Sequence, residues 1–224
     1  MLILKNISQR DKNLPSTFVS FLNYRKLINS KLDLTQINIF LDGSLIKSLV
    51  KFINPKADLN SYNFDFSNLA PEVISNGLNK FSKVILIGGT NEESKKSESY
   101  LRSFFKTKKI YVYDGYDNLS YFLKSPHKLN DSMLILSLGC PLQEKTAIFL
   151  NQTTKETEIY TSGAFVSQTS VHGVNYYNEF LIKFNLKFLQ RLFLEKGHLT
   201  RVIKEIPSFF KLLCKLNMEI KTFN

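Results

Sequence analysis

Cysteine and histidine are scarce in this chain. Its 224 residues include two cysteines, Cys140 and Cys214, and three histidines. The cysteines form no CxxC pair and have no histidine cluster nearby, which argues against both a disulfide framework and a zinc site. We therefore expect two small buried thiols, no metal ligands and no cofactor.

Long apolar runs are also missing. The longest uncharged stretch, residues 159–178, is full of Ser, Thr, Gln, Asn and Gly, whereas a membrane-spanning helix needs about 20 predominantly apolar residues. The start, MLILKNISQR, lacks both the basic region and the cleavage sequence of a secretory signal. We expect a cytoplasmic protein, peripheral to a membrane at most.

Acidic residues are too few to balance the basic ones. The chain has 30 Lys and Arg against 19 Asp and Glu, which gives a net charge of +11 and a pI near 9.5. Such an excess favours an anionic partner: nucleic acid, anionic lipid or a phosphorylated substrate. No signature of a nucleic-acid-binding fold accompanies the charge, so we expect no nucleic-acid partner.

Six short apolar runs, bounded by polar residues or by Gly and Pro, predict strands. They are residues 17–22, 37–41, 83–87, 109–113, 132–138 and 158–162. Helical spacing lies between them at 43–52, 91–107 and 141–151, and 54–69 is predicted to be an irregular connection. Strands that alternate with helices indicate a Rossmann-like α/β fold, with a mainly parallel sheet flanked by helices.

The pattern changes near residue 176, where Lys and Phe become dominant at helical spacing. We predict an α/β body over residues 1–175 and a basic helical appendage over 176–224. Lys183, Lys187 and Arg191 share one helix face, which favours an anionic membrane surface as partner. The alternative is a docked helix with a solvated charged side. The appendage could close its own site or that of a neighbouring copy in a homo-oligomer.

The stretch LGCPLQEK, residues 138–145, follows a strand that reads as buried. A turn of small residues leads at once to an amide and a carboxylate, Gln143 and Glu144. In open α/β sheets, ligands bind outside the carboxyl ends of the strands. The stretch is therefore interpreted as one wall of a substrate site.

Polar or glycine residues follow the other strands as well. Asp42 and Gly43 come after 37–41, where the carboxylate could orient or deprotonate a sugar hydroxyl, or simply cap a helix. Gly88 and Gly89 could cradle a phosphate with backbone N–H groups, or only form a tight turn. Tyr116 could stack on a base or sugar, or belong to the core. The segment SGAFVSQTS, 162–170, suits a lining close to a ligand.

The order of these segments resembles the WecG/TagA/CpsF family of bacterial glycosyltransferases. The similarity runs from about residue 17 to 210, and its most specific part is Gly-x-Pro-x-Gln-Glu at 139–144. The other segments are FLN (21–23), FLDG (40–43), ILIGG (85–89), DGY (114–116), SGAF (162–165) and LKFLQRL (186–192).

The resemblance implies an activity and its substrates. Members move a sugar, often of the N-acetylhexosamine type, from a UDP-sugar to a polyprenyl-diphosphate-linked sugar at the inner face of the cytoplasmic membrane. The transfer inverts the anomeric carbon, requires no divalent metal and serves cell-surface polysaccharide synthesis.

The resemblance also implies residue roles. Asp42 would be the general base, and Asn23, at the end of the first strand, would line the same cleft. Gln143 would contact donor or acceptor. Arg191 and Arg201 would neutralise the diphosphate. These cations suit a leaving group that no metal ion stabilises.

Several positions depart from the family pattern. Val166 stands where an Asp is usual, Asn63 lies nearest to the place of an expected Arg, and His198 replaces another Arg. An Arg-Ala-Pro stretch before the appendage reads Tyr176, Tyr177, Asn178. The alternatives are a different sugar or acceptor, or a degenerate member that binds a UDP-sugar or lipid-linked intermediate without transfer.

Overall fold

A computed structural model describes residues 6–43, 47, 60–173, 200, 203, 204 and 207. Six strands form one sheet in the order β2-β1-β6-β5-β3-β4, and each pair of neighbours runs parallel. The strands are β1 (Ser16–Val19), β2 (Asn38–Leu41), β3 (Lys83–Gly88), β4 (Ile110–Tyr113), β5 (Ser132–Ser137) and β6 (Thr157–Thr161). The six predicted strands and the α/β Rossmann-like class are confirmed.

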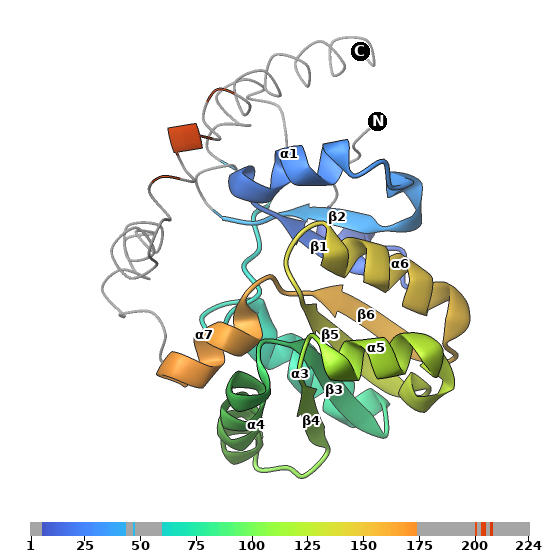
Figure 1. The fold of residues 1–224 in the computed structure, drawn as a ribbon, viewed down its shortest axis with the longest axis vertical. Coiled ribbons are helices and arrows are strands. Elements are labelled where there is room, and N and C mark those ends of the chain that lie inside the picture. The colour runs from blue at the N-terminus through green and yellow to red at the C-terminus, as the bar shows by residue number, and fades with distance from the viewer. Residues whose placement is uncertain are drawn as a thin grey trace.

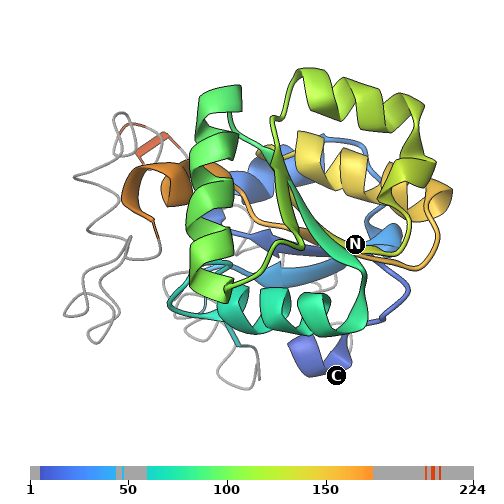
Figure 2. The same cartoon turned by 90° about the horizontal axis from the view of Figure 1, so that it is seen from below.

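Helices follow the strands and cover both faces of the sheet (Figures 1 and 2). The α-helices are α1 (Phe21–Asn29), α3 (Leu69–Lys80), α4 (Asn91–Phe105), α5 (Asp117–Lys124), α6 (Leu142–Thr153) and α7 (Phe165–His172). Short 3-10 helices occupy Ile7–Gln9, Leu34–Gln36 and Pro126–Leu129. The predicted helices at 91–107 and 141–151 correspond to α4 and α6.

Two apolar clusters form, because neighbouring strand residues point to opposite faces. On β1, Phe18 belongs to the cluster that α3, α4 and α7 cover, and Val19 to the one under α1, α5 and α6. On the central strand β5 all six residues are buried, as expected of a strand between two helical layers. The near-continuous apolar run of this strand therefore has a direct structural cause.

Some predictions fall outside the described residues. The predicted helix at 43–52 is described only at Gly43 and Lys47, and the predicted irregular connection at 54–69 only from residue 60 onward. The segment 60–68 has no helix and one isolated bridge, from Ser61 to Leu41. The appendage at 176–224, with its boundary, stays a prediction. No helix in the described part is long and apolar enough to span a membrane.

Candidate active site

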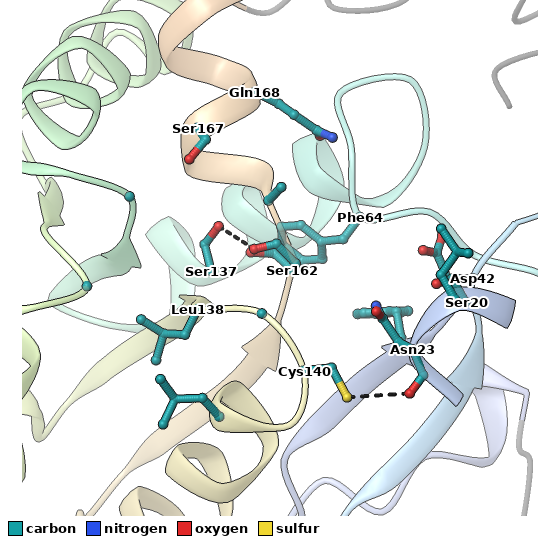
Figure 3. Close-up of a pocket in the computed structure, with 18 of the residues that line it drawn as sticks. Ser20, Asn23, Asp42, Phe64, Ser137, Leu138, Cys140, Ser162, Ser167 and Gln168 are labelled. Carbon is teal, nitrogen blue, oxygen red and sulfur yellow. Dashed lines mark hydrogen bonds between the residues drawn. The ribbon is translucent and has the colours of Figure 1, made fainter. Parts of the chain in front are cut away.

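A cavity of about 500 Å³ opens at the edge of the sheet where the strands have their carboxyl ends. Its wall takes residues from the segments that follow all six strands, among them Asn23, Asp42, Gly89, Tyr116 and Gly163. Figure 3 shows Ser20, Asn23 and Asp42 on one side of the cavity and Ser137, Ser162 and Ser167 on the other. This is where parallel α/β sheets bind ligands.

Asn23 lies in the first turn of α1, not at a strand end as predicted. The first strand ends at Val19, and Ser20 is the N-cap of α1. Ser20 is the one polar residue between Val19 and the apolar pair Phe21 and Leu22. Ser is a common helix N-cap, but within a short apolar run it fits a strand pattern as well. The Cys140 thiol donates to the Asn23 carbonyl oxygen at 3.6 Å, which joins α1 to the loop after β5.

Asp42 follows β2 and lines the cavity. Its backbone N–H donates to the Val19 carbonyl oxygen at 3.0 Å, which fixes the Asp42 backbone against the end of β1. The next residue, Gly43, has a φ of +96°, a conformation that glycine adopts at little cost. Gly43 is not part of the described cavity wall, so Asp42 is the residue that this turn contributes.

Of the glycine pair at the end of β3, Gly89 lines the cavity and Gly88, the last residue of the strand, does not. A Cβ on Gly88 would lie 2.2 Å from the Ser137 carbonyl oxygen, so this position needs a glycine for the close approach of β3 to β5. The helix that follows is already capped: Glu93 Oε2 accepts from the Thr90 N–H at 2.7 Å, and Thr90 Oγ1 from the Glu93 N–H at 3.3 Å. A phosphate at this turn would compete with Glu93.

Tyr116 stands at the N-cap of α5 with 71% of its surface exposed, which rules out a core role. Asp114 Oδ1 accepts from the N–H groups of Tyr116 and Asp117, each at 2.9 Å, and Oδ2 from the Asn118 side chain. Burial alone would raise the pKa of Asp114, but these hydrogen bonds outweigh it and lower the pKa. A firmly held turn thus carries an exposed ring at the cavity wall.

The LGCPLQEK stretch contributes Leu138, Gly139, Cys140 and Leu142 to the wall. Gln143 and Glu144 turn the other way and are 1% exposed, while the apolar Leu142 is 47% exposed. The stretch does form a wall, as interpreted from the sequence, but its backbone and apolar side chains provide the surface. A direct substrate contact by Gln143 or Glu144 stays a prediction.

Cys140 is only half-buried and lies at the cavity wall, not in the core as expected. Desolvation, followed by the nearby Glu144 carboxylate, raises the pKa of its thiol well above the usual range. The thiol is therefore protonated at neutral pH and is no activated nucleophile. Cys214 lies outside the described residues.

The loop after β6 places Ser162, Gly163 and Ala164 in the wall, followed by Ser167 and Gln168 of α7. Ser137 Oγ donates to the Gly163 carbonyl oxygen at 2.7 Å and accepts from the Val166 N–H at 3.1 Å. Val166 itself is fully buried, so this position offers the cavity no polar group. The expectation of a small, hydroxyl-rich lining here agrees with these positions.

Sequence reasoning missed two charged groups of the wall, Lys26 and Asp65, and did not treat Glu93 as a site residue. Over the residues that the structure describes, the wall carries three carboxylates, Asp42, Asp65 and Glu93, and one ammonium group, Lys26. Lys26 could have been noticed, because it lies one helical turn after Leu22 and Asn23. Asp65 could not, since it arrives from an irregular segment.

The predicted diphosphate ligands Arg191 and Arg201 lie outside the described residues. In the described part of the chain, no group of three or more His, Cys, Asp or Glu side chains is placed to hold a metal ion. The described part of the body thus lines the cavity with more carboxylates than cations.

Comparisons with known proteins agree with this geometry. The sequence pattern of the glycosyl transferase WecG/TagA/CpsF family matches residues 3–222. The chain is also 29% identical over 199 residues to a UDP-Gal:alpha-D-GlcNAc-diphosphoundecaprenol beta-1,4-galactosyltransferase of Shigella boydii, a match that covers 86% of this chain and 82% of the relative. The chain therefore belongs to the WecG/TagA/CpsF family of glycosyltransferases.

Proposed function

We propose that this glycosyltransferase moves a sugar from a UDP-sugar to a polyprenyl-diphosphate-linked sugar, with inversion at the anomeric carbon and without a divalent metal. The observation that carries the proposal is the cavity at the carboxyl edge of the sheet. It brings together Asn23, Asp42, Gly89 and Tyr116, which are far apart in the sequence and come from four different connections. The Shigella relative supports the substrate class, since its name specifies a nucleotide-sugar donor and a diphosphoundecaprenol acceptor.

Asp42 acts as the general base. Its carboxylate takes the proton of the acceptor hydroxyl, whose oxygen then forms a bond to the anomeric carbon of the donor sugar. The bond from that carbon to the UDP oxygen breaks, and UDP leaves with the electron pair. Asn23, on the same side of the cavity (Figure 3), orients the sugars. Positioned bases contribute about 10²–10⁴-fold to such reactions.

The UDP moiety lies against Gly89 and Tyr116, where the exposed phenol ring can stack on the base. Its diphosphate enters a wall with three carboxylates and one lysine. The charge balance calls for further cations, and Arg191 and Arg201 of the appendage are the proposed source. The basic appendage also suits contact with the anionic membrane surface that holds the acceptor, at the cytoplasmic face.

The donor sugar is either an N-acetylhexosamine, as the family resemblance implies, or galactose. The second candidate is favoured by the Shigella relative, whose name specifies UDP-Gal. Both are tested by one panel of UDP-sugars offered with a short-chain polyprenyl-diphosphate-linked sugar. Acceptor-dependent release of UDP identifies the donor.

The first test of the mechanism is Asp42→Asn, assayed in EDTA with the donor so identified. We expect kcat to fall about 10²–10⁴-fold with little loss of UDP affinity, because the amide keeps the shape and loses the proton acceptor. Asp33→Asn is the matched control, since Asp33 caps an exposed 3-10 helix away from the cavity. Turnover of Asp42→Asn within about threefold of the wild type would refute the assignment of the base.

Two further results bear on the proposal as a whole. Loss of wild-type turnover in EDTA, restored by a divalent cation, would contradict the metal-independent mechanism. Binding of UDP without release from any donor and acceptor pair would favour a family member that binds and does not transfer.

A further inference from the structure

A buried group of polar side chains lies behind the cavity wall. It consists of Thr17 on β1, Thr161 on β6, and Gln143 and Glu144 at the start of α6, each at most 1% exposed. Thr17 Oγ1 donates to Glu144 Oε1 at 2.8 Å, and Gln143 Nε2 donates to the same oxygen at 2.9 Å. The two threonine hydroxyls are 2.7 Å apart. We call these four side chains the polar clamp.

The donors and acceptors of the polar clamp permit one arrangement. A carboxylate only accepts, so the single hydroxyl proton of Thr17 points to Glu144, and Thr161 must donate to Thr17. The side-chain amide of Gln143 donates from its NH₂ group to Glu144, and its oxygen accepts from the Gly163 N–H at 3.1 Å. Glu144 thereby sets the orientation of Gln143, and Gln143 holds the turn after β6 that forms part of the cavity wall.

The polar clamp crosses the weakest junction of the sheet. Strands β1 and β6 pair through one residue pair, Ser16 with Tyr160, whereas β5 and β6 pair from Ser132 with Thr157 through Leu136 with Thr161. Toward the carboxyl end, the side chains of Thr17 and Thr161 replace the missing backbone ladder. Glu144 accepts from Thr17 and is linked to Thr161 only through Thr17.

The same junction divides the cavity. Asn23 and Asp42 belong to the part built on β1 and β2, whereas Gly89, Tyr116 and Gly163 belong to the part built on β3, β4, β5 and β6. Asp42 has to reach the acceptor hydroxyl while that hydroxyl faces the anomeric carbon of the donor. This requires the two parts of the cavity to keep a fixed relative position. The polar clamp lies where that position is set.

A carboxylate is a costly way to join two strands. Glu144 Oε2 is buried and has no partner of good hydrogen-bond geometry among the described residues, although the weak donor Cys140 lies beside the carboxylate. Burial of an incompletely satisfied carboxylate works against stability. Replacement of buried ionic groups by apolar ones is often neutral or stabilising. Glu144 therefore contributes geometry more than folding free energy.

We propose that Glu144 is a positioning residue for sugar transfer. Through Thr17 and Gln143 it aligns the part of the cavity that carries the base with the part that holds the donor. This inference rests on the proposed function, and it assigns Glu144 a role through Thr17 and Gln143 in place of the substrate contact predicted from the sequence. Misplacement of reacting groups by about 1 Å can cost about 100-fold in rate, so loss of the polar clamp is expected to lower kcat about 10- to 100-fold.

The experiment uses the full-length protein with three substitutions in the polar clamp. Glu144→Ala and Thr17→Val remove hydrogen bonds across the junction. Glu144→Gln is the conservative variant, because its amide oxygen can still accept from both Thr17 and Gln143. Acceptor-dependent UDP release gives kcat and KM, calorimetry gives the Kd of UDP alone, and thermal unfolding gives Tm.

Glu158→Gln is the matched control. Glu158 is a largely buried carboxylate at the opposite end of β6, where it binds Arg10 at 2.7 Å and Lys80 at 3.1 Å and accepts from the Tyr160 hydroxyl at 2.7 Å. Its loss disturbs the same strand away from the cavity. We expect a lower Tm and an unchanged kcat for this variant, assayed well below its Tm.

The expected result is a fall in kcat for Glu144→Ala and Thr17→Val, with the Kd of UDP within about threefold of the wild type and kcat largely restored in Glu144→Gln. The proposal is overturned if Glu144→Ala and Thr17→Val keep kcat within about threefold. It is also overturned if kcat and UDP affinity fall in parallel, or if Glu144→Gln is as impaired as Glu144→Ala.

Failure of the proposed function would be seen separately, as a wild type that releases no UDP from any pair. Hydrogen exchange then still tests the polar clamp. Glu144→Ala should speed amide exchange in residues 16–19 and 157–161 relative to residues 83–88, whereas Glu158→Gln should not affect the carboxyl ends of β1 and β6. Unchanged exchange in Glu144→Ala would overturn the clamp without reference to activity.

Discussion

Asp114 offers a direct test of how the turn that bears Tyr116 is held. Its carboxylate accepts two backbone N–H groups at 2.9 Å and an amide of Asn118 at the start of α5. In Asp114→Ala these donors lose their acceptor at a site that is 6% exposed. Loss of an N-terminal helix cap costs about 0.5–2 kcal/mol, and hydrogen bonds to a charged group about 1.5–3 kcal/mol each. We expect a loss of about 2 kcal/mol in the free energy of unfolding.

The assay is urea unfolding at neutral pH, with thermal unfolding beside it. For a chain of this size, a loss of about 2 kcal/mol corresponds to a Tm lower by about 4–8 °C. Asp33→Ala is the control, because Asp33 accepts from the Thr35 N–H and hydroxyl in the same way but in an exposed turn. We expect a smaller loss in that variant, since water can replace the missing acceptor.

The pH dependence of the free energy of unfolding gives a second test of the same variant. The pKa of Asp114 is lower in the folded protein than its ordinary value of 3.8. The stability from this carboxylate is therefore fully present above the unfolded pKa, and is lost as the pH falls through the folded pKa. The difference between wild type and Asp114→Ala should shrink below about pH 4. A difference that stays constant to pH 2, or that is absent at pH 7, would refute the reasoning.

Two further substitutions test the close approach of β3 to β5 and the charge of the cavity wall. Gly88→Ala places a Cβ 2.2 Å from the Ser137 carbonyl oxygen and should lower the free energy of unfolding by about 1–3 kcal/mol; an unchanged urea midpoint would show that β3 and β5 can separate at no cost. Lys26→Ala removes the cation of the described wall and should raise the KM for the UDP-sugar about two- to fivefold, less so at high salt. Lys124→Ala, at an exposed position at the end of α5, is its control. Equal effects in the two variants would contradict a local role for Lys26.

The strands could be predicted from the sequence because their apolar runs are short and clearly bounded. Several helices could not. The helix α1 follows β1 with only Ser20 between them. The apolar pattern therefore predicts strand through Phe21 and Leu22, and the family resemblance places Asn23 at its end. The helices α5 and α7 are eight residues each, too short for a 3.6-residue period to stand out. Tertiary contacts, and not local pattern, fix their position.

The wall after β5 shows the same limit at the level of single residues. Hydropathy favours an inward Leu142 and outward Gln143 and Glu144, but the structure has Leu142 at 47% exposure and the two polar side chains at 1%. The reversal depends on Thr17 and Gly163, which lie 127 and 20 residues away from their partners in the chain. No local pattern contains that information.

The charges of the cavity bear on how the donor can bind. The described wall carries three carboxylates, one of them the proposed base Asp42, and one lysine. This balance opposes entry of a diphosphate, so donor binding calls for cations from a separate segment. Arg191 and Arg201 are the proposed source, because they could neutralise the UDP without being part of the described wall that carries the base. Removal of Arg191 and Arg201 should therefore weaken UDP binding and leave the folding of the unliganded body unchanged. Removal of the Asp42 carboxylate should instead lower kcat and leave UDP binding nearly unchanged.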